Sequence, residues 1–306
     1  MSDLDRLRAE RESRLRGGDP AGSARYSEVI DRYLAAAGYR NEGGPAVAEP
    51  KPAPAAAGIV VVGAEESPAS YTAVDHAAIE AEVRGCGLRI VHVQRSGGFR
   101  PASRDEGMRL IERLTARVHA YAPAVPVTSR LLTGSASSLL LAEASDAELL
   151  VVGQRHSAAA AAMGLGVGDR VATQHPGTVM VVRMPGWPPG PGLGNRPVVV
   201  GVELPGTVSP AVRLAFQEAK VRGCELIMVN AIPHAVPSSR IEVVDGLRVH
   251  RHLVDEAPAA ALIRASNDAA AVVVGRHAYS GSVMPLLGSV TRAVLREAYC
   301  PVFVVG

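Results

Sequence analysis

The sequence predicts an α/β protein made of two tandem units, each a parallel sheet with helices on both faces. Short β-branched runs alternate with helical segments from residue 58 to the end of the chain, which is typical of parallel sheets covered on both sides. The pattern also repeats at an offset of 138 residues. Val198-Val-Val-Gly201-Val-Glu203 parallels Val60-Val-Val-Gly63-Ala-Glu65, and Arg222-Gly-Cys224 parallels Arg84-Gly-Cys86.

Size and composition agree with two soluble domains. The chain has 306 residues, of which 47% are hydrophobic and 20% charged, and its net charge of +2 is nearly neutral. Its arginines are spread among acids, so no concentrated basic face for nucleic acid is expected. The three cysteines form no metal or disulfide pattern, and no apolar run is long enough for a membrane span. We therefore expect a cytoplasmic protein without a membrane or nucleic-acid partner.

The segment before the first unit, residues 1–57, reads as a helical arm followed by a linker. Residues 3–16 predict a charged helix that ends at Gly17-Gly18, and Ala21 to Ala37 predict a second helix. The second helix has one apolar face, which must be covered by this chain or by a second copy, with a foreign protein partner as the alternative. Residues 41–57, rich in Pro, Ala, Glu and Gly, are the linker. The apolar face consists of Tyr26, Val29, Ile30, Tyr33, Leu34 and Ala37.

The first unit, residues 58–183, is expected to contain five strands and four helices. Residues 184–196, rich in Pro and Gly, follow as an interdomain linker that contains Trp187. We expect strands at 59–63, 88–93, 127–132, 149–153 and 178–182, and helices at 70–84, 105–121, 137–144 and 168–174.

The second unit, residues 197–306, is shorter. Gly153 and Gly275 are 122 residues apart, so 16 residues are missing between the second and third strands, where the first unit has the helix 105–121. Residues 233–246 contain two prolines and a glycine and are interpreted as a loop. We expect an uncovered apolar face there, which the helix from Tyr26 to Ala37 or a partner chain would cover.

The last stretch carries the candidate site. A β-branched run ends at Gly275, a loop of small residues follows, and Gly288-Ser289 opens a helix that runs to about Ala298 before a final strand at 301–305. Ser289 is expected to cap this helix, and the free backbone N–H groups of its first turn suit an anion such as phosphate.

This stretch resembles the nucleotide-binding loop of the universal stress protein family, G-x2-G-x9-G-[S/T], with Gly275, Ala278, Gly288 and Ser289 at its positions. The resemblance covers residues 58–182 and 197–306 as a tandem pair. It implies two five-stranded doubly wound sheets of the adenine nucleotide alpha hydrolase-like type, with ligand at the carboxyl ends of the strands. It also implies pairing through the last strands, 178–182 and 301–305, either in a homodimer or within the tandem chain.

The resemblance implies two unequal sites. In the second unit Ala278 replaces the family's second glycine, and Glu203 replaces an aspartate near the ribose. In the first unit His156 replaces that glycine, and Gly166-Val167-Gly168-Asp169 replaces the final Gly-Ser, so that the carboxylate of Asp169 occupies the phosphate position. ATP is therefore expected in the second unit only. Its site would consist of Glu203, Ala231 beside the adenine, Gly275, Ala278, Gly288, Ser289 and Val290.

Catalysis has little support, because the chain lacks a P-loop, a zinc-protease motif and a nucleophile elbow. His250 and His252 share one face of a strand but lack further metal ligands, and a solvated edge strand is the simpler interpretation. The leading hypothesis is a cytoplasmic nucleotide-responsive regulator in the stress response. The alternatives are a nucleotide-free interaction protein with vestigial pockets and partner contacts through the N-terminal arm, and an enzyme of another doubly wound family.

Overall fold

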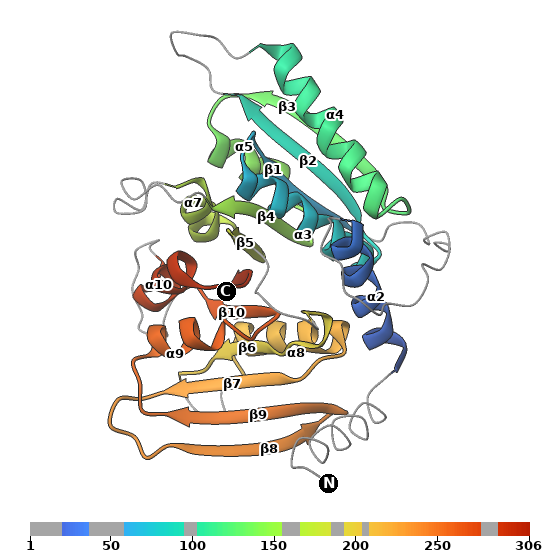
Figure 1. Ribbon diagram of the computed structural model, residues 1–306. Helices are drawn as coiled ribbons and strands as arrows, with labels where there is room; N and C mark the ends of the chain where they lie inside the picture. The colour runs from blue at the N-terminus through green and yellow to red at the C-terminus, as the bar shows by residue number, and fades with distance from the viewer. Residues whose placement is uncertain are drawn as a thin grey trace.

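A computed structural model describes residues 20–36, 58–94, 103–154, 166–184, 193–203, 208–276 and 287–306 (Figure 1). Its described strands form one eleven-stranded sheet in the order β3-β2-β1-β4-β5-β11-β10-β6-β7-β9-β8. All neighbouring strands are parallel except for β5 with β11 and β8 with β9. The predicted α/β class with two doubly wound halves is confirmed. None of the helices in the described ranges has the length and apolar character needed to cross a membrane.

The first half has the elements that the sequence predicts. Valine-rich runs buried on both faces form the central strands, and α3 begins after an N-cap Ser67 and ends at Gly85 in the left-handed conformation. The elements are β1 (Ile59–Ala64), α3 (Pro68–Arg84), β2 (Gly87–Gln94), α4 (Arg104–Tyr121), β3 (Val127–Thr133), α5 (Ala136–Glu143), β4 (Leu149–Gln154), α7 (Val167–Gln174) and β5 (Val179–Arg183).

The second half repeats this order with one replacement, because a strand takes the place of the second helix. Before it comes the short 3-10 helix η1, in the part of the predicted linker that the structure describes; Trp187 lies outside the described residues. The elements are η1 (Leu193–Asn195), β6 (Val198–Gly201), α8 (Pro210–Arg222), β7 (Leu226–Ala231), β8 (Ser238–Val244), β9 (Leu247–Val254), α9 (Pro258–Ala265), β10 (Ala271–Gly275), α10 (Ser289–Glu297) and β11 (Val302–Val305).

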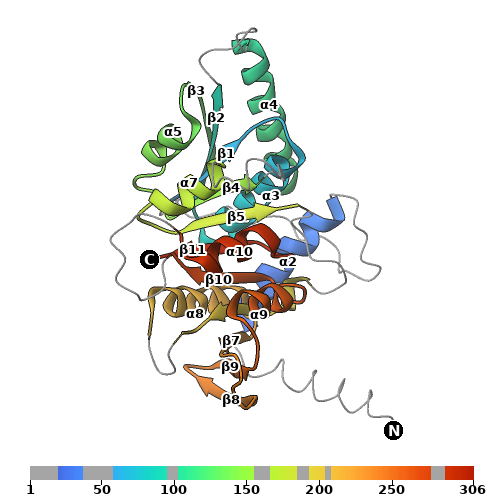
Figure 2. The ribbon, with the colours of Figure 1, turned by 90° about the vertical axis from the view of Figure 1, so that its left-hand side faces the viewer.

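The halves are joined through their last strands. In the antiparallel pair of β5 and β11, Met180 lies opposite Phe303, with Val179 opposite Val304 and Val181 opposite Val302 (Figure 2). This arrangement relates the halves by an approximate two-fold axis at the pair Met180 and Phe303, both fully buried. The expected last-strand pairing therefore occurs within the chain.

The core has two layers, one on each face of the sheet. One layer lies under α3, α4, α8 and the N-terminal helix α2 (Pro20–Ala36), and the other lies under α5, α7, α9 and α10. Alternate strand residues supply the two layers, as Val60 and Val61 do in β1. Each layer runs through both halves without interruption, so the sheet is one packed body.

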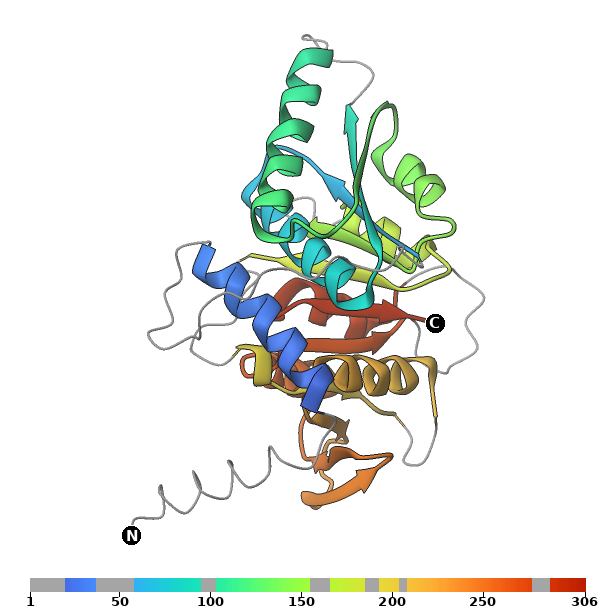
Figure 3. The same cartoon turned by 90° about the vertical axis from the view of Figure 1, so that its right-hand side faces the viewer.

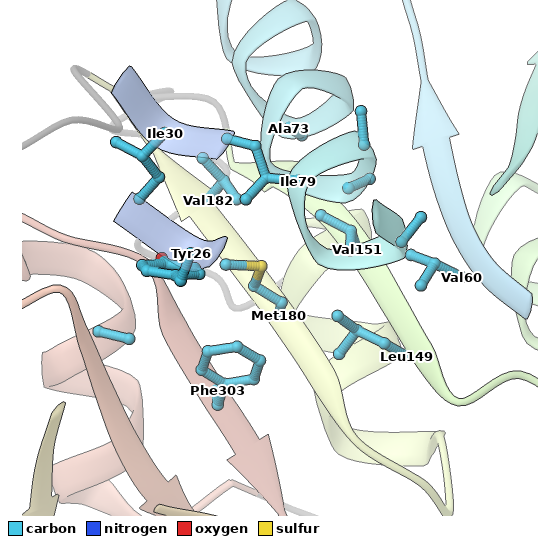
Figure 4. Packing of buried hydrophobic residues seen from close by; sticks show 14 of the residues in the cluster. Tyr26, Ile30, Val60, Ala73, Ile79, Leu149, Val151, Met180, Val182 and Phe303 are labelled. Atoms are coloured by element: carbon cyan, nitrogen blue, oxygen red, sulfur yellow. The ribbon is translucent and has the colours of Figure 1, made fainter. Parts of the chain in front are cut away.

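Helix α2 lies across the junction of the halves, where it packs on α8, α3 and η1 (Figure 3). Its predicted apolar face is confirmed for Tyr26, Val29, Ile30, Tyr33 and Leu34, which are all buried; Ala37 and residues 3–16 lie outside the described residues. In Figure 4 Tyr26 lies close to Met180 and Phe303. The expectation that this helix covers the open sheet face of the second half is therefore wrong.

The described residues between β7 and β9 form no helix, but the predicted loop at 233–246 is wrong over half of its length, where β8 lies. Strand β8 pairs antiparallel with β9 through a two-residue turn in which Asp245 and Gly246 both have positive φ. An Asp-Gly pair between two β-branched runs is a strong hairpin signal that the sequence analysis did not use. On the α8 side of the sheet, Arg251 donates a hydrogen bond to Glu242 across the hairpin at 2.6 Å. Charged side chains therefore lie on the face where an uncovered apolar surface was expected.

A buried ion cluster crosses the junction beneath α2. Glu80 and Arg84 of α3 meet Glu218 and Arg222 of α8, which are their counterparts at the 138-residue offset. Arg84 bonds Glu218 at 2.5 Å, and Arg222 bonds Glu80 in return. The ring centroid of Tyr26 lies 4.9 Å from the guanidinium of Arg222, so α2 covers the ion cluster.

Candidate functional site

The candidate site lies where the strand order of the second half reverses. From β6 the chain proceeds to β7 on one side of the sheet and later to β10 on the other, so a crevice is expected at the carboxyl ends of β6 and β10. Gly275 is the last residue of β10, and Ala231 is the last residue of β7. Glu203 follows β6 by two residues and is exposed, while Ala231 is half-buried on the α9 side.

Helix α10 begins at the same edge. Gly288 is its N-cap, with φ −55° and ψ 152°, and makes no side-chain cap hydrogen bond. The backbone N–H of Gly288 donates to Arg276 O at 3.0 Å, and Thr291 Oγ1 donates to Gly275 O at 2.7 Å. These two bonds hold the first turn of α10 against the end of β10. Thr291 is a site residue that the sequence analysis missed.

The structure corrects the expected role of Ser289. It is the first residue of α10 rather than its cap, and it is exposed. Its backbone N–H and that of the half-buried Val290 belong to the first turn, where an α-helix has no internal acceptors. The described site residues thus share one edge of the sheet: Glu203, Ala231, Gly275, Gly288, Ser289 and Val290. Ala278 lies outside the described residues.

The start of α7 is the equivalent position in the first half, and it differs in charge. Its N-cap is Gly166, so Val167 corresponds to Ser289 and Asp169 to Thr291. Gly166 therefore corresponds to Gly288, and the expected position of Asp169 at the place of Ser289 is wrong by two residues. Burial raises the pKa of Asp169, while Arg296, the backbone N–H of Gly166 and Arg292 oppose that shift. The first turn of α7 carries an acid, whereas the first turn of α10 carries none.

In the first half, the start of α3 lies against the end of β4. Helices α3 and α8 both end at a left-handed glycine, but α3 has 17 residues and α8 has 13, so α3 starts one turn earlier. That extra turn lies against β4, since a Cβ on Gly153 would be 2.7 Å from Ala69 O. Nearby, the Glu65 N–H donates to Ser70 Oγ at 2.8 Å. His156 lies outside the described residues.

Arg276 follows Gly275 directly, yet its side chain serves the junction of the halves. It is buried, and its Nε donates to Ala172 O at 2.9 Å while its Nη2 donates to Gly177 O at 3.1 Å. A guanidinium at the end of α7 satisfies a carbonyl of the last turn and opposes the negative end of the helix dipole. Burial lowers the pKa of Arg276. The sequence carries no local signal for a contact between residues so far apart.

The histidine pair on β9 lies beside a glutamate of the neighbouring segment. His250 Nε2 lies 2.8 Å from Glu225 Oε2, and the rings of His250 and His252 are 6.2 Å apart between centroids. Within the described ranges, no group of three or more His, Cys, Asp or Glu residues has an arrangement that could hold a metal ion. The predicted edge-strand position is wrong, because β8 lies outside β9.

Comparisons with known proteins agree with this architecture. A family model described as the universal stress protein family matches residues 57–183 and 239–306, which together are more than half of the chain. Universal stress protein Rv1996 of Mycobacterium tuberculosis is 27% identical over 302 residues, covering 80% of this chain and 94% of that protein. Universal stress protein Rv2005c of the same organism is 28% identical over 282 residues, covering 80% and 96%.

Solved structures show the same fold. The crystal structure of a universal stress protein from Archaeoglobus fulgidus aligns with a TM-score of 0.63 at 17% identity, covering 81% of this chain and 97% of that one. A functionally unknown protein, PA1789 from Pseudomonas aeruginosa, aligns with a TM-score of 0.56 at 13% identity, covering 81% and 92%.

Proposed function

We propose that this chain, which belongs to the universal stress protein family, is a regulatory protein that binds ATP in its second half. The observation that carries this proposal is the start of α10, which has no side-chain cap and no acid in its first turn. An uncapped helix start attracts phosphate through its free N–H groups and the positive end of its dipole. Its regulatory role would be cytoplasmic, where the three free, buried thiols stay reduced.

The residues at this edge fit an adenine nucleotide in their chemistry. Ser289 offers a hydroxyl and a backbone N–H to phosphate, and Val290 offers a second N–H. The exposed carboxylate of Glu203 can accept hydrogen bonds from ribose hydroxyls. Ala231 is half-buried and apolar, as the edge of a base requires. Gly275, which has no Cβ, would allow phosphates to approach the end of β10 closely.

The proposal limits ATP to one site per chain. In the first half Asp169 places a carboxylate in the first turn of α7, and the first turn of α3 lies against Gly153. A phosphate there would face a negative charge and the packed first turn of α3.

The test compares two matched substitutions. Ser289 and Val167 are both exposed residues at the first position of equivalent helices. Ser289→Asp should weaken ATP binding by about tenfold or more, since repulsion of about 1.4 kcal/mol corresponds to tenfold in affinity. The same variant should bind adenosine nearly as well as the parent. Val167→Asp should leave the affinities for ATP and for adenosine unchanged. Isothermal titration calorimetry measures affinity and stoichiometry, with one ATP per chain expected.

Three results would contradict the proposal. Two equivalent ATP sites would contradict the limit to the second half. If Ser289→Asp weakened the binding of ATP and of adenosine equally, the phosphate would not lie at the start of α10. No ATP binding by the parent chain would favour the nucleotide-free interaction protein, with partner contacts through the N-terminal arm. A carboxylate stabilises a helix start, so both variants should fold with a stability change within about 1 kcal/mol.

A further inference from the structure

Strand β8 is the end strand of the sheet and differs from its counterpart at the other end. The opposite end strand, β3, is covered by α4, which packs on both β2 and β3. On β8, Ile241 and Val243 are 57% and 69% exposed. In the part of the chain that the structure describes, only β9 pairs with β8, on its inner side. Exposed β-branched residues on an unpaired edge are a template for another strand.

The two faces of β8 differ in character. Ile241 lies opposite His250 and Val243 opposite Arg248, so these apolar residues share the α9 side of the sheet. Glu242 and Arg240 lie on the other side, opposite Val249 and Arg251. The Arg240 side chain is 78% exposed, and its contact with Glu242 is long, at 3.9 Å. This edge therefore presents an acid and a base on one face and two β-branched residues on the other.

The order of these residues suits antiparallel pairing with an identical strand. A two-fold axis normal to the sheet through Ile241 places Ile241 opposite Ile241 of the second copy. It also places Arg240 opposite Glu242 and Glu242 opposite Arg240, where directly opposed side chains share a face and contact. A register centred on Arg240 or on Glu242 would instead oppose like charges. The register at Ile241 thus combines two ion pairs with a central apolar pair.

We propose that two copies of this chain associate through β8, in antiparallel register centred on Ile241. The last-strand edges β5 and β11 pair with each other within the chain, so those edges are not available to a second copy. The outer edge of β8 is continuous with the same sheet, and pairing there would extend it through two molecules. This dimer is independent of nucleotide binding.

The first test uses charge reversal. Sedimentation velocity over a range of protein concentrations should show a monomer–dimer equilibrium for the parent chain. Arg240→Glu or Glu242→Arg alone should raise the dimer dissociation constant at least about tenfold, because each places like charges opposite each other twice. An equal mixture of the two variants should dimerise again, since the mixed pair has an acid opposite a base at both positions. Arg130→Glu, on the exposed part of β3, is the matched control and should have no effect.

The second test fixes the register through cysteines. All three native cysteines are buried, so a new thiol on β8 is the reactive one. Ile241→Cys should form an inter-copy disulfide on mild oxidation, because opposed residues lie about 4.5–5.5 Å apart between Cα atoms, within disulfide range. Ser239→Cys, on the same face, should not, because its equivalent in the second copy would be displaced by about 14 Å along the strand.

A parent chain that stays monomeric at every concentration tested would overturn the proposal. So would a dimer that survives both single reversals, or a mixture that fails to restore it. Equal cross-linking of Ile241→Cys and Ser239→Cys would overturn the register. Because Glu242 also bonds Arg251, circular dichroism should verify that Glu242→Arg is folded. If Glu242→Arg is not folded, the two cysteine variants and Arg240→Glu decide the outcome, because the Arg240 side chain is exposed.

Discussion

At the scale of the residue, His175 is unusual because it is buried without a hydrogen-bond partner among the residues that the structure describes. It follows α7 directly and is 1% exposed, and neither ring nitrogen bonds another described residue. Arg276, which bonds carbonyls on both sides of His175 in the sequence, adds a positive charge to the same region. Burial and the charge of Arg276 lower the pKa of His175. The neutral imidazole is therefore the form that the folded protein accommodates.

This environment predicts a loss of stability in mild acid. Because the folded pKa lies below the unfolded value of about 6.5, the unfolded chain binds more protons as the pH falls below that value. One linked proton changes the free energy of unfolding by up to about 1.4 kcal/mol per pH unit. His175→Leu should unfold with equal or greater free energy at pH 7.5, since two unpaired polar atoms are removed, and should lose less stability between pH 6.5 and 5.

Urea unfolding at several pH values measures this effect. Exposed His119, replaced by Gln, is the control and should keep the parent's slope. His252 also has a pKa lowered by burial and by His250, so some slope should remain in His175→Leu. Identical slopes for the parent and His175→Leu would show that the buried ring is not the source.

At the scale of the element, α2 joins the two halves from outside the sheet. Tyr33 bonds Asp75 of α3, which Arg117 of α4 also holds at 2.6 Å. Tyr26 contacts the second half through Arg222. The helix also lies very close to η1, because a Cβ on Gly194 would be 2.7 Å from Ser27 Oγ. Helix α2 is thus a structural part of the core, and its apolar face is not free for a foreign partner.

A charge on the buried face of α2 should detach the helix. Ile30 is 3% exposed, so Ile30→Asp would bury an unpaired carboxylate and should reduce the free energy of unfolding by more than about 2 kcal/mol. The exposed core layer should then bind more of a hydrophobic dye such as ANS. Glu28→Ala, on the exposed face of the same helix, should change stability by less than about 0.5 kcal/mol. Unchanged dye binding in Ile30→Asp would contradict this role of α2.

At the scale of the whole molecule, the halves form one folding unit. The sheet is continuous through β5 and β11, and the ion cluster pairs each arginine with a glutamate of the other half. Arg222 is 1% exposed and also faces Phe303, with 5.4 Å from its guanidinium to the ring centroid. Burial raises the pKa of Glu218, but Arg222 and Arg84 outweigh it and hold that pKa below its usual value.

Removing one arginine should therefore destabilise the entire chain. Arg222→Met leaves Glu80 and Glu218 buried with Arg84 alone, which should cost about 3–5 kcal/mol. Unfolding should remain a single transition when followed by circular dichroism and by calorimetry, because neither half keeps its core layers without the other. Arg213→Met, on the exposed face of the same helix, is the control. Two separate transitions, or a loss below 1 kcal/mol, would contradict the role of this cluster.

The sequence by itself determined the tandem α/β fold, the order of its elements except for β8, the family and the edge of the sheet where a ligand is expected. These properties are encoded locally. Strand runs such as Val60-Val-Val are recognisable from composition, and a repeat is visible when Arg84-Gly-Cys86 recurs as Arg222-Gly-Cys224. The spacing from Gly275 to Gly288 placed the start of α10 correctly, although Gly288 rather than Ser289 is its cap.

Only the tertiary structure decided how these parts meet. Helical periodicity marked the face of α2 to be buried but not its target, because an apolar face fits any apolar surface of similar shape. Cross-half contacts, such as Arg276 with α7 or Arg84 with Glu218, join residues 104 and 134 positions apart and leave no local pattern. The hairpin at Asp245-Gly246 was the exception, since its turn signal is local. Long-range geometry decided the rest, because the sheet brings together side chains that the chain itself keeps far apart.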